Sequence, residues 1–321
     1  MSLPIIIIHE GNPFYLSTCI HHAKVYNPNS TIYLLGDKSN RHLADKQIIH
    51  EFITDYFIQA EAFAPLYRHY TTNPYHYNLF CFQRWFMLRE FMEAKKLEQI
   101  FVCESDELLF CDVEKECPLT NETDFTLLGK YLACSITMSY RGIVRFTDFL
   151  TQAYSDSKTQ DFLLNQYYSD SFFHGKRISM GGIGDMTLFK LYCDRFENSV
   201  LEVAYPINNH CWDAAVHRSD GFQMEKGIKK ITWIDNLPYA TYKNGELIRM
   251  SGIHFCGGNK MKEFLFMVDD DKKHIDPKTL RWFMVKQWII KTLNGFKRFP
   301  FFVRRFFQKL SCTFWRKWYK L

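Results

Sequence analysis

The N-terminal order of apolar runs and a helical segment constrains the fold most. Residues 4–8 and 31–35 are short apolar runs that predict buried strands. Between them, residues 14–26 predict a helix, which the NPNS sequence at 27–30 ends. Strand, helix and strand joined by short loops form a right-handed βαβ unit with parallel strands. The sequence therefore predicts an α/β fold built on a mixed, mainly parallel sheet flanked by helices.

The composition is that of a folded protein with a large core. The chain has 321 residues, of which 47% are hydrophobic and 17% aromatic. No apolar run reaches the roughly 18 residues of a membrane-spanning helix, and the N-terminus has no basic segment typical of a signal peptide. Ten cysteines are scattered without a CxxC pair. We expect a cytoplasmic protein with reduced, mostly buried thiols.

Positive charge is concentrated at the C-terminus. Residues 276–321 contain twelve Lys and Arg and a single acid, Asp276, against 40 and 35 in the whole chain. The remainder therefore carries a net charge of −6, which argues against a nucleic-acid surface on the body. We expect a catalytic domain at residues 1–275 and a separate tail at residues 276–321.

The tail interleaves basic residues with large aromatic residues at helical spacing. This pattern is typical of an amphipathic helix that lies on an anionic membrane surface. Pro300 is expected to break the helix into two pieces. The pattern predicts peripheral attachment to a membrane, with a helix pair packed on the body as the alternative.

An acidic pair follows a buried strand in the first half of the chain. The stretch 99–112 reads QIFVCESDELLFCD, and it places Glu104 and Asp106 directly after an apolar run. Acids at the carboxyl end of a parallel strand lie where α/β sheets bind ligands. Oxygen ligands at this spacing suit a divalent cation that also holds phosphates. The alternative is a strand end with solvated acids.

Polar residues in three neighbouring segments could share this site. His9 and Asp37 follow the first two predicted strands, and Asp37 could bind a ribose or a base. The alternative for Asp37 is a turn residue after Gly36. A helix expected over residues 79–96 leads into the acidic stretch, so Arg84 could point toward the same crevice or lie on the surface.

Two later segments also carry candidate residues. The glycine-rich stretch at 178–189, ISMGGIGDMTLF, predicts a substrate-facing turn with a helix from Asp185, or a tight turn capped by that Asp. A β ribbon over residues 231–255 is followed by HFCGGNK at 254–260. That loop offers an imidazole to a metal, and backbone N–H groups and a lysine to a diphosphate. Otherwise His254 is structural.

This order of features resembles the nucleotide-sugar glycosyltransferases of the GT-A fold. The acid-x-acid motif and HFCGGNK are similar to those of the retaining family that includes glycogenin and lipopolysaccharide galactosyltransferases. The resemblance implies these roles: metal ligands Glu104, Asp106 and His254; diphosphate contacts Gly257 and Lys260; and sugar-side catalytic residues Arg84 and Asp185. Glu104 and Asp106, with His9 and Asp37, are also the expected contacts of the nucleotide donor.

The expected function is metal-dependent sugar transfer. The donor would be a nucleotide-diphosphate sugar, with a UDP-sugar favoured, and the cation Mn²⁺ or Mg²⁺. The acceptor would be a glycan or a lipid-linked glycan. Retention of configuration is favoured; inversion would require a general base, for which Asp185 is the first candidate. The alternatives are a non-catalytic α/β membrane-associated binding protein and a nucleotidyltransferase.

Overall fold

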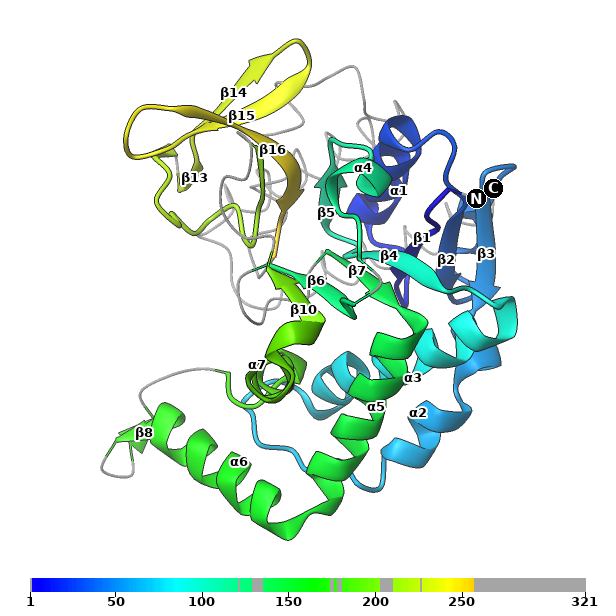
Figure 1. Cartoon of the computed structure of the whole chain (residues 1–321), viewed down its shortest axis with the longest axis vertical. Helices are drawn as coiled ribbons and strands as arrows, with labels where there is room; N and C mark the ends of the chain where they lie inside the picture. The colour runs from blue at the N-terminus through cyan, green and yellow to red at the C-terminus, as the bar shows by residue number, and fades with distance from the viewer. Residues whose placement is uncertain are drawn as a thin grey trace, which may run out of the picture. The chain divides into compact units, whose positions relative to one another are not determined.

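The computed structural model describes most of the N-terminal part of the chain (Figure 1), namely residues 2–120, 122–128, 135–173, 176–177, 181–202, 210–225 and 227–256. The chain divides into two units, Met1–His274 and Ile275–Leu321, and every described residue belongs to the first. The predicted tail at residues 276–321 lies outside the described residues, as do Gly257 and Lys260.

The main sheet has seven strands. In spatial order they are β10 (Val200–Glu202), β6 (Phe125–Leu127), β7 (Ile136–Ser139), β4 (Gln99–Cys103), β1 (Ile5–Ile8), β2 (Ile32–Gly36) and β3 (Ile48–Phe52). All neighbouring pairs are parallel except those of β7, which runs antiparallel to β4 and β6. The predicted mixed, mainly parallel sheet is confirmed.

Helices flank this sheet. They are α1 (Phe14–Tyr26), α2 (Ile58–Phe63), α3 (Tyr75–Lys95), α4 (Val113–Glu116), α5 (Tyr140–Ser155), α6 (Ser157–Ser171) and α7 (Asp185–Arg195), with 3-10 turns η1 (Arg41–Leu43), η2 (Ile53–Tyr56) and η3 (Glu197–Ser199). The helix α3 packs against α2 and α5, as Figure 1 shows. None of the described helices combines the length and the apolar composition that crossing a bilayer requires.

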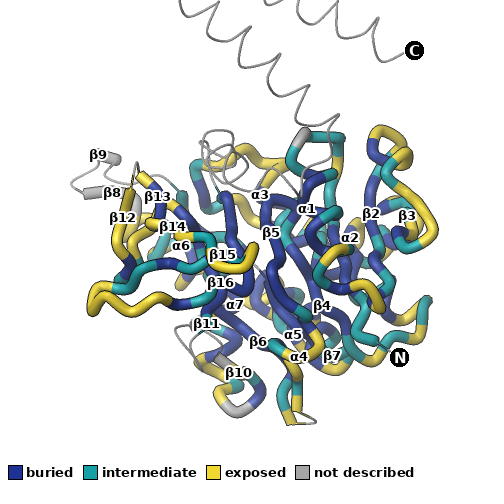
Figure 2. The backbone as a smooth tube through the Cα atoms, turned by 90° about the horizontal axis from the view of Figure 1, so that it is seen from above, coloured by how far each residue is buried: buried dark blue, intermediate teal, exposed yellow. Residues whose placement is uncertain are grey.

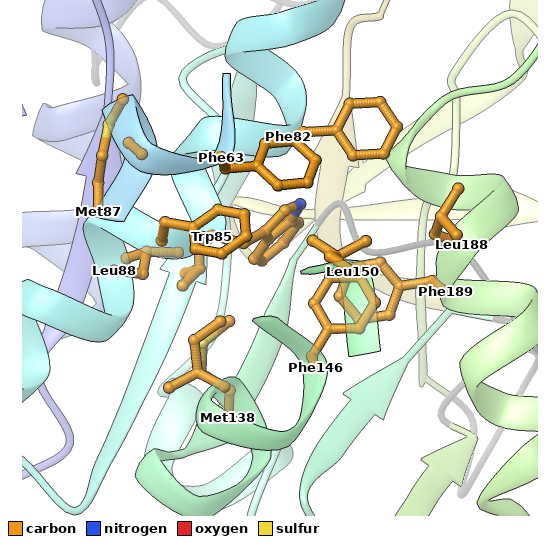
Figure 3. Close-up of a cluster of buried hydrophobic side chains, with 14 of the residues drawn as sticks. Phe63, Phe82, Trp85, Met87, Leu88, Met138, Phe146, Leu150, Leu188 and Phe189 are labelled. Carbon is orange, nitrogen blue, oxygen red and sulfur yellow. The ribbon is translucent and has the colours of Figure 1, made fainter. Parts of the chain in front are cut away.

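The two faces of the sheet bury two separate clusters of side chains. Successive residues of a strand point to opposite faces, so Ile6 joins one cluster and Ile5 and Ile7 join the other. The larger cluster holds the aromatic face of α3 together with residues of α5 and α7 (Figure 3). Within it, the rings of Phe146 and Phe189 stack with centroids 3.8 Å apart. The central strands β6, β7, β4, β1 and β2 are therefore buried on both faces, whereas the edge strands β3 and β10 contain exposed residues (Figure 2).

A second, smaller sheet joins the C-terminal described residues to the middle of the chain. It contains β11 (His210–Trp212), β16 (Leu247–His254), β15 (Leu237–Thr241), β14 (Ile231–Ile234) and, paired with β16, β5 (Glu107–Leu109). Two hairpins complete the described strands: β12 (Met224–Glu225) with β13 (Ile228–Lys229), and β8 (Phe172–Phe173) with β9 (Lys176–Arg177). The β ribbon expected over residues 231–255 is confirmed.

Element bounds differ from the sequence expectation mainly at helix starts. The helix expected from residue 79 begins at Tyr75, directly after Pro74. Its first turn contains no apolar stripe, so hydrophobic spacing could not locate it. The helix expected near Asp185 begins at that residue, with Gly184 as the N-cap. As expected for the thiols, six of the eight described cysteines are buried.

Candidate functional site

The candidate site forms where β4 ends and β5 begins. The carboxyl ends of the parallel strands β1, β2 and β4 lie at one edge of the main sheet, where open α/β sheets bind ligands. After Cys103 the chain turns through Glu104 and Asp106 into β5, which pairs with β16. In that pairing Glu107 stands opposite His254. The smaller sheet therefore delivers a histidine to the acidic turn.

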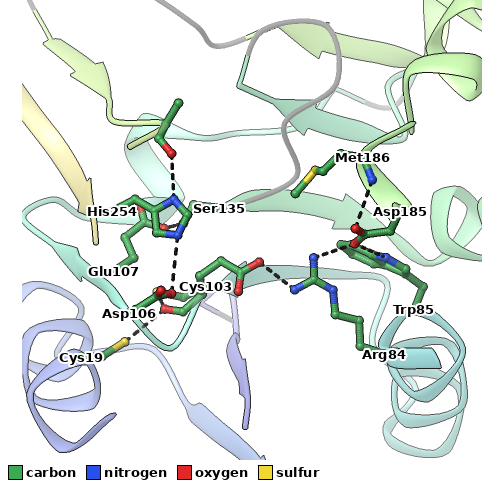
Figure 4. A network of polar contacts seen from close by, with 12 residues as sticks. Cys19, Arg84, Trp85, Cys103, Asp106, Glu107, Ser135, Asp185, Met186 and His254 are labelled. Carbon is green, nitrogen blue, oxygen red and sulfur yellow. Dashed lines mark hydrogen bonds and ion pairs between the residues drawn. The ribbon is translucent and has the colours of Figure 1, made fainter. Parts of the chain in front are cut away.

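Asp106 and His254 face each other in this corner (Figure 4). The imidazole Nε2 of His254 lies 3.5 Å from Oδ1 of Asp106, and both side chains are at most one-tenth exposed. The other ring nitrogen, Nδ1, lies 2.9 Å from the carbonyl oxygen of Ala214. A carbonyl can only accept, so this contact assigns the hydrogen to Nδ1. In the neutral ring, Nε2 therefore presents a lone pair toward Asp106.

Asp106 and His254 together offer two of the ligands that a metal site requires. A carboxylate oxygen and an imidazole lone pair repel each other unless a cation lies between them or the ring takes up a proton. Metal-binding histidines commonly donate their other N–H to a backbone carbonyl, as His254 does to Ala214. Within the described residues, no group of three or more His, Cys, Asp or Glu side chains is arranged to hold a metal ion. Asp106 and His254 thus fit the role of metal ligands, whereas the third predicted ligand, Glu104, is not grouped with them.

That third residue, Glu104, is bound to Arg84. The guanidinium Nη1 of Arg84 donates to Oε1 of Glu104 at 2.7 Å, and Nη2 donates to Oδ2 of Asp185 at 2.9 Å (Figure 4). Burial lowers the pKa of Arg84, but the two carboxylates outweigh it and hold that pKa well above its usual range. The structure thus brings together three predicted residues from a turn and two helices, α3 and α7.

Asp185 accepts further hydrogen bonds. Its Oδ2 also accepts from Nε1 of Trp85 at 3.1 Å, and its Oδ1 accepts from the backbone N–H of Met186 at 3.1 Å. The Arg84 guanidinium lies over the Trp85 ring at 4.6 Å from the ring centroid. Asp185 is therefore held in one orientation, at the start of α7 and only 8% exposed.

Two acids near the site, Glu107 and Asp213, were not predicted from the sequence. Glu107 is fully buried, and its Oε1 accepts no hydrogen bond within the described part of the chain. Burial, reinforced by the charges of Glu104 and Asp213, raises the pKa of Glu107 to about 8, although His254 and a bond from Ser135 oppose the rise. The second acid, Asp213, accepts a hydrogen bond from the backbone N–H of His254. Neither stands in a recognisable motif, so only the tertiary structure reveals them.

The loops after β1 and β2 form a network of their own. Asp37 accepts from the N–H groups of Gly11 and Ser39, both at 2.7 Å, which is the behaviour of a turn residue. Slight burial raises the pKa of Asp37, but the hydrogen bond from the Ser39 hydroxyl and those from backbone N–H groups outweigh it, so the pKa is lowered overall. The buried Asn40 donates to the carbonyls of His9 and Gly11, each at 2.8 Å. His9 and Asp37 thus stand in adjoining loops, at the sheet edge that carries the acidic turn.

The glycine-rich turn packs against the segment before α3. Thr72 N donates to Gly181 O at 2.8 Å, and Ile183 N donates to Tyr70 O at 2.7 Å. These hydrogen bonds connect the turn that leads into α7 at Asp185 to residues 70–72, the segment that leads into α3. The turn is therefore part of the support of the Arg84–Asp185 ion pair.

The chain is similar to solved glycosyltransferase structures at very low sequence identity. Mouse xyloside xylosyltransferase 1 is 7% identical over 66% of this chain and 88% of its own, with a TM-score of 0.45. An active-site mutant of LgtC is 11% identical over 80% and 88%, with a TM-score of 0.47. The galactosyltransferase LgtC with donor and acceptor sugar analogues is 10% identical over 81% and 89%, with a TM-score of 0.45. No protein-family model and no curated protein matches the sequence.

Proposed function

We propose that this protein is a metal-dependent glycosyltransferase that uses a nucleotide-diphosphate sugar, with a UDP-sugar favoured. The acceptor in this proposal is a glycan or a lipid-linked glycan. The observation that carries it is the convergence of Asp106 with His254, beside the Arg84–Glu104 and Arg84–Asp185 ion pairs. These groups meet at the carboxyl ends of parallel strands, where α/β sheets bind ligands.

Asp106 and His254 are the proposed ligands of Mn²⁺ or Mg²⁺. Glu104 remains the third candidate, because Oε1 bonds to Arg84 and a carboxylate has a second oxygen to offer. Bound there, the cation would neutralise charge on the departing diphosphate. The chain supplies the rest of the environment: it orients His254 through Ala214 and keeps the facing side chains largely out of water.

Asp185 is proposed to orient the sugar. A carboxylate that already accepts from Arg84, Trp85 and a backbone N–H is fixed well enough to hold a sugar hydroxyl in one position. This favours the retaining route, in which a diphosphate oxygen takes the acceptor proton. In the inverting route Asp185 would itself take that proton as general base.

Three further contributions belong to the same proposal. His9 and Asp37 would contact the nucleotide, and Gly257 and Lys260 the diphosphate. The basic tail at residues 276–321 would hold the enzyme at an anionic membrane surface on the cytoplasmic side. Each follows from the sequence patterns and the resemblance described above.

A nucleotide panel tests the proposal directly. We expect UDP to raise the melting temperature when MnCl₂ is present, and UDP with EDTA, GDP or CMP to do so much less. Asp106→Asn and His254→Gln should abolish the effect of the metal, because each removes one proposed ligand. Asp55→Asn, which alters an exposed acid, should leave it intact.

The panel also separates the alternative functions. A wild-type protein that shows no response to any nucleotide with Mn²⁺ would favour a non-catalytic binding protein. Hydrolysis of a UDP-sugar by the wild type, lost in Asp106→Asn, would support sugar transfer. Full hydrolysis by Asp106→Asn in EDTA would remove the metal from the proposal.

A further inference from the structure

A buried lysine lies on the far side of the loop that holds His254. Lys229, at the end of β13, is 1% exposed and its ammonium group donates to three oxygens. These are Oδ1 of Asp213 at 2.7 Å, the carbonyl of Ala215 at 2.9 Å and Oδ2 of Asp220 at 3.1 Å. A lysine ammonium has three hydrogens, so all three are used and none is left for a substrate.

The loop 213–216 is bonded to His254 on its other side. Asp213 Oδ2 accepts from the backbone N–H of His254 at 3.2 Å. Val216 N donates to the carbonyl of His254 at 2.9 Å, and Ala214 O receives the ring Nδ1–H at 2.9 Å. The backbone and the ring of His254 are therefore all held by one four-residue segment.

The same segment is held by Lys229. In addition to the ammonium contacts, the backbone N–H of Lys229 donates to Val216 O at 2.8 Å. The loop is thus fixed between a buried lysine and the histidine, and one carboxylate, that of Asp213, touches both. Removing the ammonium would leave the Asp213 carboxylate buried without a cation and Ala215 O with only the N–H of Arg218 as donor, which destabilises this arrangement.

We propose that Lys229 and Asp213 are positioning residues, which hold the loop 213–216 so that Ala214 fixes His254 with Nε2 directed at Asp106. The inference rests on the proposed function in one respect, since it assigns that orientation to metal binding. The lysine acts only through the loop. Metal ligands depend on such outer partners, whose loss typically weakens metal binding about 10–100-fold.

The first test reads the histidine itself, without metal or nucleotide. Long-range ¹H–¹⁵N spectra distinguish a ring protonated at Nδ1 from one protonated at Nε2, and His254→Gln identifies the signal. For the neutral ring, we expect the Nδ1–H form in the wild type. Lys229→Met should give a mixture of the two forms. Lys230→Met, the same change at the exposed neighbouring residue, should keep the wild-type form.

The second test measures Mn²⁺ itself by electron paramagnetic resonance of MnCl₂ titrations. Lys229→Met should raise the Mn²⁺ Kd about tenfold or more, and Lys230→Met should not change it. If the wild type binds no Mn²⁺, the proposed function fails, and the ring signal alone decides the positioning role. An unchanged ring signal in folded Lys229→Met would overturn the proposal.

A double variant covers the case in which Lys229→Met does not fold. Lys229→Met with Asp213→Asn removes the charges of these two residues, and Asp220 keeps its ion pair with Arg218, so no unpaired charge is buried. We expect this variant to fold and to show the mixed ring signal. A folded double variant with the wild-type signal would contradict the proposal. Loss of the fold in both variants, with Lys230→Met intact, would assign the network to folding and would also overturn it.

Discussion

At the scale of single residues, Arg84 organises the candidate site. Its guanidinium lies within 3 Å of two carboxylates, from the β4–β5 turn and from the first residue of α7. Two carboxylates so close together repel, and their partial burial limits how far water can screen them. The arginine therefore holds the turn and α7 against α3, and it does so with geometry that a single-point cation such as lysine cannot reproduce.

We expect Arg84→Met to lower the free energy of unfolding by about 3 kcal/mol, because it leaves both partly buried carboxylates unpaired. Arg89→Met on the same helix is the control. Arg89 pairs with Asp148, whose side chain is 65% exposed, so its loss should amount to less than about 1 kcal/mol. Urea unfolding of both variants measures the difference. Equal losses would show that the buried pairs add no more stability than the exposed pair of Arg89.

At the scale of elements, the glycine turn determines where α7 begins. Gly182 has φ +139° and forms a bridge with Thr71. A Cβ at this position would come within 2.4 Å of Tyr70 O and 2.7 Å of Thr71 Cα, both backbone atoms. The neighbouring Gly181 also has a positive φ, +105°, but a Cβ there would meet nothing within 4 Å. Substitutions at the two glycines therefore distinguish the cost of backbone strain, at Gly181, from the added cost of steric collision, at Gly182.

Substitution by alanine should reveal this difference. Gly181→Ala should lower the free energy of unfolding by about 1 kcal/mol through backbone strain alone. Gly182→Ala adds collisions with backbone atoms and should lower it by about 3 kcal/mol or more. Guanidinium denaturation of the two variants gives both values. Losses of the same size would mean that the close packing on residues 70–71 is easily relieved.

The sequence predicts elements better than it predicts partners. Hydrophobic spacing located the central strands, because these segments bury both faces. The glycine-rich stretch and Asp185 located the start of α7. The acid-x-acid motif, the late histidine motif and the family resemblance selected Arg84, Glu104, Asp106 and His254 as residues of one site. The sequence could not show that Glu104 bonds to Arg84, since side-chain partners depend on how separate elements pack. Lys229 gave no signal, because a lysine next to a turn is ordinarily exposed.

At the scale of the whole molecule, charge separates the body from the tail. Residues 276–321 carry twelve basic residues and one acid, whereas the rest of the chain is net acidic. An anionic surface attracts the basic segment at residues 276–321 and repels the net acidic remainder of the chain. The attraction weakens as salt screens the charges. The membrane proposal therefore depends on the tail alone.

We expect full-length protein to float with liposomes that contain phosphatidylserine at low salt, and a variant ending at residue 275 to remain at the bottom. Neutral liposomes and 0.5 M NaCl serve as controls, because both reduce electrostatic attraction. Flotation in a sucrose gradient measures the bound fraction. Equal flotation of both proteins would exclude the tail as the membrane-binding segment.

The pairing of β5 with β16 has a consequence for synthesis on the ribosome. The strands β1 to β4 pair with one another in the order β4, β1, β2, β3, so this part of the sheet can assemble once residue 103 has left the exit tunnel, before β7 is made to pair with β4. Almost 150 further residues must be synthesised after Asp106 before His254 is available to contact it. A nascent chain can thus acquire much of its parallel sheet long before it acquires the corner that is proposed to bind metal.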